Sequence, residues 1–567
     1  MKKIPYGISN FRMLRKENYL YVDKTKYIQL LEEYPPYQFF IRPRRFGKSL
    51  FVSMLDAYYD MNSDKEFEEL FGNLYIGRNP TQKRNQYLIL KISFAGIETG
   101  SGEEKLKESF SYKVKSAAQE FLDRYAAIIG EDKVPPDLHS AESVMEFIRR
   151  VAKKSGKQVF VLIDEYDNFA NELITGGKKA AYENLMHGEG LVKAFFKTVK
   201  DATMDNFARL FMTGVSPIML DDLTSGLNIT DNLTLRNKLN SMLGFTEGEV
   251  VEILKNCNLY SPGILGDMKK YYNGYRFSPD IDVEHVYNSD MTLYFIKDVA
   301  ENGRYPVNMI DNNVKTDYSR VNQLALNFRD RDTLERIIAD GEIDTRLVER
   351  FNLSTMYSSK ENFVSLLFYL GMLTIKEPFE DVLKLCIPNY VIKTLYWEQN
   401  FQAIQNELAF DSHDLKKHIR TMRLDGSISD FINLFKDILT GLSNRDLIGM
   451  NEKNIKMILM TLFGVDGTYM VSSEDEVTEG YIDILLTSKK QFVEHTNFEW
   501  MIELKYLKES EKERFEECKK EGLEQIIRYA RSRSVKDSID KKGLKEVLIL
   551  VTGKNHVHYE VVAADML

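Results

Sequence analysis

Cysteine, glycine, proline and long apolar runs are all scarce in this sequence of 567 residues. Its three cysteines lie more than a hundred residues apart, which provides neither a disulfide framework nor a zinc knuckle. Its 32 glycines and 13 prolines are too few for a collagenous or low-complexity chain. No apolar run approaches the roughly 18 residues that span a membrane, and the N-terminus lacks the apolar stretch of a secretory signal. We therefore expect a soluble, cytoplasmic protein with no membrane contact.

Positive charge is not in excess either. The chain has 76 Lys and Arg residues against 85 Asp and Glu residues, a net charge of −9. A protein that coats nucleic acid through bulk charge would be basic, so a histone-like role is excluded. An enzyme that contacts nucleic acid through a local site remains compatible with this balance. At about 150 residues per domain, the length predicts three or four domains.

Residues 1–245 alternate apolar, strand-like runs with amphipathic stretches, a pattern typical of a parallel α/β sheet. The expected strands are nearly continuous in hydrophobicity, as strands buried on both faces are. They cover residues 38–41, 87–94, 158–163 and 209–215. A Thr-x-x-Glu capping box at Thr246 predicts the start of a new helix, and we place the first domain boundary there.

Residues 246–465 are mostly helical in pattern and richer in tyrosine and phenylalanine. An apolar helix over 363–370 precedes two strand-like segments, 372–377 and 382–388, and then another helix. Helix, two-stranded wing and helix is a winged-helix pattern. Such modules bind DNA and also serve as plain spacers, and the pattern leaves both alternatives open.

A phosphate-binding loop is predicted after the first strand, where the sequence reads RPRRFGKS over residues 42–49. In a P-loop, N–H groups at a helix N-terminus bind phosphate, a lysine reaches the β- and γ-phosphates, and a hydroxyl binds Mg²⁺. We assign nucleotide binding to Arg45, Gly47, Lys48 and Ser49, with Ser49 on the metal. The motif G-x-x-x-x-G-K-[S/T] is incomplete, because Arg42 stands where the first glycine belongs.

A second nucleotide-binding element is predicted at VFVLIDEYD, residues 159–167. A buried strand that ends in two carboxylates suits a Walker B strand, in which Asp164 would hold Mg²⁺ and Glu165 would orient the attacking water. The alternative is an ordinary central strand followed by an acidic turn. A further strand ends in TGVSP, which places Ser216 where a sensor of the γ-phosphate would lie. Together the three elements predict ATP binding.

These segments resemble the bacterial AAA-ATPase-like family. The resemblance spans residues 4–290, and its motifs are IPYGI (4–8), YVDKTK (21–26), RPRRFGKS (42–49), LIDEYD (162–167), TGVSP (213–217) and YNGYRF (272–277). It implies a P-loop NTPase domain in which an arginine-rich loop replaces the glycine-rich one. Whether that loop hydrolyses ATP or only binds it stays open. Arg276 is either a contact to the γ-phosphate or a surface arginine.

The last domain, residues 466–567, carries a carboxylate and lysine cluster. Asp483 lies in an apolar strand, and Glu503 and Lys505 follow at i and i+2 of another, which puts them on one face. Two converging carboxylates provide the hard oxygen ligands that Mg²⁺ prefers. A lysine beside them can position water or stabilise charge on a phosphate. The alternative for a lone Glu-x-Lys is a salt bridge on an exposed strand.

The order Asp…Glu-x-Lys followed by Gln525 and Tyr529, one turn apart on a helix, resembles the RecB-like branch of the PD-(D/E)xK nuclease superfamily. The resemblance implies that Asp483, Glu503 and the Leu504 carbonyl bind Mg²⁺ or Mn²⁺. It also implies that Lys505 is catalytic and that Gln525 and Tyr529 support the site or contact the phosphate backbone. The arginine that often precedes the aspartate is absent, and Tyr481 follows Gly480 instead.

The sequence thus predicts an α/β protein with an N-terminal P-loop sheet, a helical and winged-helix middle region and a C-terminal nuclease domain. The expected function is hydrolysis of phosphodiester bonds, in DNA rather than RNA, by a metal-dependent nuclease regulated by an ATP-binding module. One alternative is an ATP-responsive switch or scaffold that binds nucleic acid without cutting it. Another is a nuclease with a vestigial ATPase half. A homo-oligomer is compatible with either.

Overall fold

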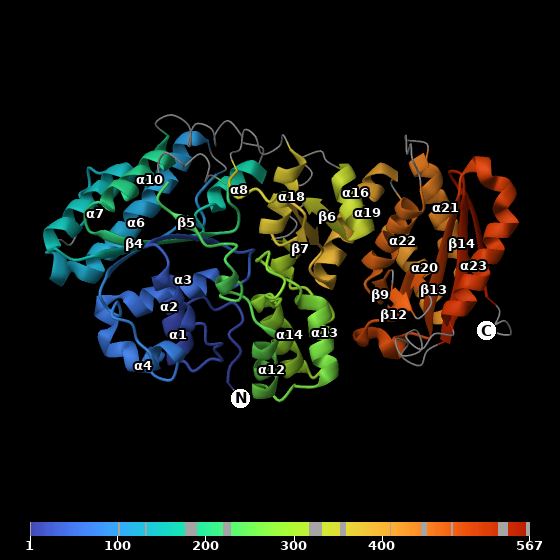
Figure 1. The fold of residues 1–567 in the computed structure, drawn as a ribbon, viewed down its shortest axis with the longest axis horizontal. Helices are drawn as coiled ribbons and strands as arrows, with labels where there is room; N and C mark the ends of the chain where they lie inside the picture. The colour runs from blue at the N-terminus through green and yellow to red at the C-terminus, as the bar shows by residue number, and fades with distance from the viewer. Residues whose placement is uncertain are drawn as a thin grey trace. The chain divides into compact units, whose positions relative to one another are not determined.

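In the computed structural model the chain forms two compact units, and Figure 1 labels most of their helices and several of their strands. The first unit is Met1–Gly303, Met309–Arg331 and Glu342–Tyr390, and the second is Arg304–Asn308, Asp332–Gly341 and Val391–Leu567. The predicted domain limits after residues 245 and 465 stay predictions. The structure describes residues 2–99, 102–130, 133–175, 190–218, 228–316, 331–351, 359–408, 410–443, 451–473, 475–477, 480–530 and 543–562.

A five-stranded parallel sheet organises the first unit, in the order β2-β3-β4-β1-β5. The strands are β1 (Tyr37–Ile41), β2 (Leu88–Ser93), β3 (Val159–Asp164), β4 (Phe207–Gly214) and β5 (Asp231–Asn232). The first four confirm the predicted strands, and β5 is a short addition at the edge. Because all five strands are parallel, the loops that follow them meet at one edge of the sheet, where open α/β sheets bind ligands.

Helices cover both faces of this sheet. Figure 1 shows α6 (Glu103–Ile129), α7 (Ala141–Ser155) and α10 (Leu191–Ala202) on one side and α3 (Lys48–Tyr59) on the other. The chain moves one way along the sheet from β1 to β2 and back from β2 to β4, so right-handed crossovers place these helices on opposite faces. The other helices are α1 (Phe11–Lys16), α2 (Lys26–Glu33), α4 (Phe67–Phe71), α5 (Tyr75–Arg78), α8 (Asn168–Thr175), α12 (Glu247–Asn256), α13 (Pro262–Tyr272), α14 (Ser289–Asn302) and α18 (Lys360–Tyr369).

The capping box at Thr246 is confirmed. The Glu249 backbone N–H donates to Thr246 Oγ1 at 3.2 Å, and the Thr246 N–H donates to Glu249 Oε2 at 2.8 Å. Farther along, α18 precedes the hairpin of β7 (Thr374–Phe379) and β8 (Val382–Cys386), which confirms the predicted strand pair. The unpredicted strand β6 (Glu342–Thr345) adds a third member, in the order β6-β8-β7.

The second unit contains a mixed sheet in the order β15-β14-β13-β12-β9, in which only the central pair β13 and β14 is parallel. Its strands are β9 (Tyr469–Ser472), β12 (Ile484–Ser488), β13 (Phe498–Leu507), β14 (Gly543–Thr552) and β15 (His556–Val561), and a separate pair is formed by β10 (Asp475–Val477) and β11 (Gly480–Ile482). Its helices are α16 (Arg331–Asp340), α19 (Tyr390–Leu408), α20 (Ser412–Asp425), α21 (Ser429–Ser443), α22 (Glu452–Asp466) and α23 (Phe515–Ala530).

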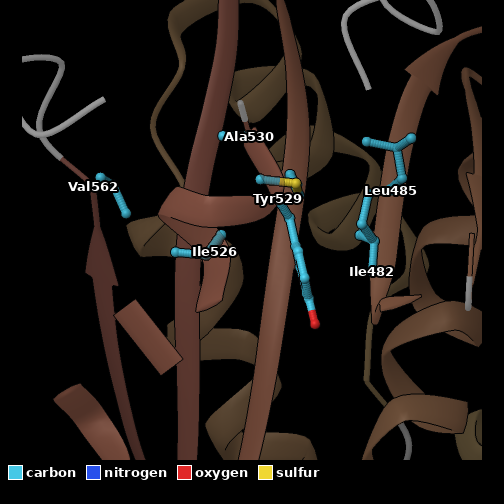
Figure 2. Packing of buried hydrophobic residues seen from close by; sticks show 7 residues of the cluster. Ile482, Leu485, Ile526, Tyr529, Ala530 and Val562 are labelled. Carbon is cyan, nitrogen blue, oxygen red and sulfur yellow. The ribbon is translucent and has the colours of Figure 1, made fainter. Parts of the chain in front are cut away.

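Helix α23 lies against one face of the mixed sheet. Ile526, Tyr529 and Ala530 pack with Ile482, Leu485, Met501 and Val562 in a buried cluster, and Figure 2 shows the hydroxyl of Tyr529 extending out of it. Gln525 and Tyr529 thus lie on a helix, as predicted, and a 3₁₀ segment, Glu509–Arg514, precedes it. On the opposite face Trp500 is buried, and its indole N–H donates to the Met422 carbonyl of α20 at 3.2 Å.

Candidate functional site

The loop after β1 has the backbone shape of a phosphate-binding loop. Gly47, which precedes the first residue of α3, has φ +89°, and Arg45 has φ +68°. Gly47 has no side chain to cap α3, so the first N–H groups of the helix are open to a ligand. Arg45 in the left-handed region costs about 1 kcal/mol or more, and such strain concentrates at functional sites.

Arg42, which replaces the first glycine of the motif, is fully buried. Its guanidinium donates to the carbonyls of Ile41 and Thr234, both at 2.8 Å, and of Leu239 at 3.1 Å. It also lies over the rings of Phe40 and Phe277, at 4.1 and 4.2 Å from their centroids. Arg42 is therefore a structural residue that fastens the base of the loop.

A cavity of about 450 Å³ opens above this loop. Its lining combines charged and polar residues with apolar ones. The first kind includes Arg44, Arg45, Lys48, Ser49, Glu165 and Asp167, beside Gly47, and the second includes Ile8, Leu14, Val22, Leu243, Phe245 and Leu293. Such a mixed lining suits a nucleotide, which has charged phosphates and an apolar base.

The structure brings five of the seven predicted nucleotide-site residues to this cavity: Arg45, Gly47, Lys48, Ser49 and Glu165. Asp164 is buried at the end of β3, and one of its oxygens accepts the Glu165 N–H at 3.0 Å. Ser216 is fully buried, and its hydroxyl donates to Asp167 Oδ2 at 2.9 Å. The functions assigned to Asp164 and Ser216 therefore stay predictions.

Asp167 is a site residue that sequence reasoning missed. Its carboxylate accepts the backbone N–H groups of Val215 at 3.0 Å and Ser216 at 2.7 Å, which ties the turn after β3 to the end of β4. Gly214 has no side chain and so leaves room for the Asp167 carboxylate, since a Cβ at position 214 would lie 2.4 Å from Asp167 Oδ1. The available signal was the third acidic residue of the DEYD turn.

The Lys48 ammonium is held inside the loop, where it donates to the carbonyls of Arg42 at 2.9 Å and Pro43 at 2.8 Å. Burial lowers the pKa of Lys48 to about 8, against the opposing attraction of Asp164. Burial raises the pKa of Glu165, and the charge of Asp164 raises it further.

We expect nucleotide affinity to fall about tenfold or more as the pH rises through about 8, because Lys48 then loses the charge that attracts phosphate. Its folded pKa lies below its ordinary value of 10.5, so its contribution to folding stability rises over the same pH range. Unfolding therefore cannot explain the lost affinity. The measurement is titration of a fluorescent ATP analogue in EDTA, with Lys48→Arg as the control that stays charged. A fall with the same midpoint in that variant would contradict the assignment.

The second site begins where the ladder between β12 and β13 ends. The last regular pair joins Ile484 to Ile502, and the Leu504 N–H then donates to Asp483 Oδ2 at 2.9 Å instead of to a strand partner. The N–H and C=O of one strand residue point to the same side, so the Leu504 carbonyl also faces Asp483. This arrangement brings two of the predicted metal ligands together.

The remaining predicted residues form a chain of hydrogen bonds from β13 to α23. Lys505 Nζ donates to Glu503 Oε1 at 2.7 Å and to Gln525 Oε1 at 2.8 Å, and Gln525 Nε2 donates to the Tyr529 hydroxyl at 2.9 Å. Glu503 is almost completely buried. The structure thus brings Asp483, Glu503, Lys505, Gln525 and Tyr529 into one site.

Electrostatics in this site are coupled. Burial raises the pKa of Glu503 to about 7, the nearby charge of Asp483 adds to the effect, and Lys505 opposes it. Burial alone would lower the pKa of Lys505, but the charge and hydrogen bond of Glu503 together with the charges of Asp483 and Glu452 outweigh it, and the pKa is raised. Lys505 therefore stays an ammonium, whereas burial and the charge of Asp483 oppose ionisation of Glu503, and a bound divalent cation would favour its ionised form.

Glu452, the first residue of α22, is a third carboxylate that sequence reasoning missed. Desolvation together with the charge of Asp483 raises its pKa. The sequence signal was Asn451, which caps α22 and places Glu452 in its first turn.

A divalent metal fits these donors as far as the described part of the chain goes. Within that part, no cluster of three or more His, Cys, Asp or Glu side chains is arranged as a complete metal site. Asp483, Glu503 and the Leu504 carbonyl leave several positions for water. Mg²⁺ binds in this way, with a few protein oxygens and several retained waters.

Two known family models match separate parts of the chain. Residues 5–224 match the family model described as "Predicted AAA-ATPase", and residues 450–561 match that of the PD-(D/E)XK nuclease superfamily. These matches confirm the predicted architecture of an AAA-ATPase-like part followed by a PD-(D/E)XK nuclease part. In the ranges that the structure describes, no helix is long and apolar enough to span a membrane.

A curated relative is the "Uncharacterized protein in vnfD 5'region" of Azotobacter chroococcum mcd 1, 29% identical over 306 residues, which cover 52% of each chain. The present chain spans about half the length of that relative. Among solved structures, Cdc6p from Pyrobaculum aerophilum is 11% identical, covers 67% of this chain and 94% of its own, and has a TM-score of 0.26. The Aeropyrum pernix ORC2 protein is 12% identical, covers 70% and 99%, and has a TM-score of 0.35.

Proposed function

We propose that the protein is a divalent-metal-dependent nuclease that hydrolyses phosphodiester bonds in DNA, and that ATP binding in its first unit regulates it. The observation that carries the proposal is the position of Lys505, held between Glu503 and Gln525 beside Asp483. A lysine with two of its three donors engaged in this way is fixed in orientation. Its third donor is then directed by the other two and can hold a water or a phosphate oxygen.

Asp483, Glu503 and the Leu504 carbonyl would hold Mg²⁺ or Mn²⁺. Bound there, the ion would polarise the phosphate and lower the pKa of a bound water. Lys505 would position the attacking water and stabilise the negative charge that develops on the phosphate oxygens. Gln525 fixes Lys505, and Tyr529 fixes Gln525 from the next turn of α23. The water oxygen bonds to phosphorus and one ester P–O bond breaks.

The substrate is supported by an exposed aromatic side chain. Tyr481 is 59% exposed and lies two residues before Asp483, in place of the arginine expected from the resemblance. An exposed ring beside a phosphate-cleaving site suits stacking on an accessible base. The order β6-β8-β7, with α18 before the hairpin, supports the winged-helix interpretation and hence a further contact with DNA.

Regulation by nucleotide is supported by how the phosphate loop is fastened. Ser289 Oγ and the Asp290 N–H, at the start of α14, both donate to the Arg45 carbonyl, at 3.1 and 3.3 Å. Asp290 also forms an ion pair with Arg45 at 3.7 Å. The phosphates of ATP would compete with Asp290 for Arg45, so binding would alter the attachment of α14. Lys48, Ser49, Asp164 and Glu165 would bind the phosphates and the Mg²⁺ that accompanies them.

The test is cleavage of single- and double-stranded DNA with Mg²⁺ or Mn²⁺, with and without ATP. We expect metal-dependent cleavage that is lost in Asp483→Ala, and an ATP effect of severalfold that is lost in Lys48→Ala. RNA of the same sequence is the control for substrate class. Binding without cleavage under every condition would favour an ATP-responsive scaffold instead. Cleavage without any ATP effect would leave the nuclease and remove its regulation.

A further inference from the structure

A second lysine lies in the nuclease site. Lys456 is on α22, one turn after Glu452, and is only 9% exposed. Its ammonium is 3.6 Å from Asp483 Oδ1. Each of the two carboxylates assigned to the metal therefore has its own lysine, Lys456 at Asp483 and Lys505 at Glu503.

Both oxygens of Asp483 are already engaged. Oδ2 accepts the Leu504 N–H at 2.9 Å, and Oδ1 faces Lys456. In a two-metal site the ions lie about 3.5–4 Å apart and share ligands, and a carboxylate between them commonly gives one oxygen to each ion. To bridge two ions in this way, Asp483 would have to turn both oxygens toward the ions and away from the Leu504 N–H and the Lys456 ammonium.

We propose that this site binds a single divalent ion, and that Lys456 supplies beside Asp483 the positive charge that a second ion would otherwise supply. The inference rests on the proposed nuclease function and specifies how many metal ions that site binds. Lys456 is a positioning residue, because it acts on the substrate only through Asp483.

The charge balance supports a single ion. A bound divalent ion favours the ionised form of the carboxylates, so in its presence Asp483, Glu503 and Glu452 contribute three negative charges against the two positive charges of Lys456 and Lys505, and the protein groups carry a net charge of −1. One divalent ion brings the site to +1, and a second would bring it to +3. Like charges a few Å apart repel one another strongly in a partly buried site, so the second ion would bind far more weakly.

The experiment is calorimetric titration of Mn²⁺ into the full chain without nucleotide or DNA. The same titration of Asp483→Ala is subtracted, so that ions bound elsewhere cancel. We expect one Asp483-dependent ion in the wild type, and about tenfold tighter binding in Lys456→Met, because the nearby positive charge is gone. Lys456→Arg keeps the charge and should bind as the wild type does. Thermal unfolding of each variant verifies that it is folded.

Lys453→Met is the matched control. Lys453 lies on the same helix, but its side chain is 71% exposed and pairs with Asp340, so Mn²⁺ binding should not change. Two Asp483-dependent ions in the wild type, or unchanged affinity in Lys456→Met, would overturn the inference and leave the nuclease proposal intact. Absence of any Asp483-dependent ion would overturn both.

Discussion

Asp483→Asn should lose divalent-metal binding and lower the rate of DNA cleavage by about 10³-fold. Asparagine keeps the shape of the side chain, and its carbonyl oxygen can still accept the Leu504 N–H, so the end of β12 stays in place. What it loses is the negative charge, which a hard cation requires. The measurement is Mn²⁺ affinity by calorimetry together with single-turnover cleavage.

Lys505→Met should lower cleavage by a similar factor for a different reason. Methionine matches the apolar stem of lysine but has no ammonium, so Glu503 and Gln525 lose the donor between them. Metal binding is expected to persist, or to become tighter, because a positive charge beside Glu503 has been removed. The loss should therefore appear in kcat rather than in Mn²⁺ affinity.

Two exposed residues of the same unit serve as controls. Asp430 has a side chain that is 61% exposed, and that of Lys520 is 79% exposed. Asp430→Asn and Lys520→Met should leave cleavage and metal binding unchanged. Retained cleavage in Asp483→Asn, or lost metal binding in Lys505→Met, would refute the division of labour between the two residues.

The strand-borne half of the nuclease site was predictable, because alternation on a strand fixes which side chains share a face. Glu503 and Lys505 follow from that rule, and Gln525 and Tyr529 from the helical repeat. Glu452 and Lys456 were not predictable in this way. They reach Asp483 only because α22 packs beside the end of β12, and no local periodicity encodes that contact.

The nucleotide site likewise contains some residues that a local motif predicts and others that only tertiary packing places. Gly47, Lys48 and Ser49 are fixed by the turn from β1 into α3, which a local motif describes. Ser216 and Arg276 depend on tertiary packing instead. Arg276 is buried and donates to the carbonyls of Ile375 and Ile281, both at 3.2 Å, so the surface alternative for this residue was wrong. The sequence alone does not indicate which backbone carbonyls will surround a given arginine in the folded protein.

Short strands were missed for a related reason. β5 has two residues, and β6 and β9 have four each, which is too few to show an alternating pattern. Each is recruited by the edge of a sheet that the longer strands have already formed. The fold class was predictable from those longer strands, whereas the edges of the sheets were not.

Arg42→Gly, which restores the first glycine of the phosphate-loop motif, should destabilise the first unit by about 5 kcal/mol rather than improve nucleotide binding. The change leaves the Thr234 and Leu239 carbonyls without a charged donor, and each such bond contributes about 1.5–3 kcal/mol. It also opens a void between the rings of Phe40 and Phe277. Arg42→Lys should cost about half as much, because an ammonium cannot reproduce the planar fork or the stacking.

Arg44 provides the comparison that separates stability from binding. It lies two residues away and lines the cavity, only partly buried. Arg44→Gly should therefore weaken binding of an ATP analogue and leave the urea midpoint of the first transition nearly unchanged, whereas Arg42→Gly should lower that midpoint strongly. If Arg42→Gly kept the wild-type urea midpoint and hydrolysed ATP faster, Arg42 would be no more than a substitution that impairs an otherwise ordinary phosphate loop. If its urea midpoint fell, Arg42 would be a structural residue of this loop, and the loop's motif would include an arginine at that position.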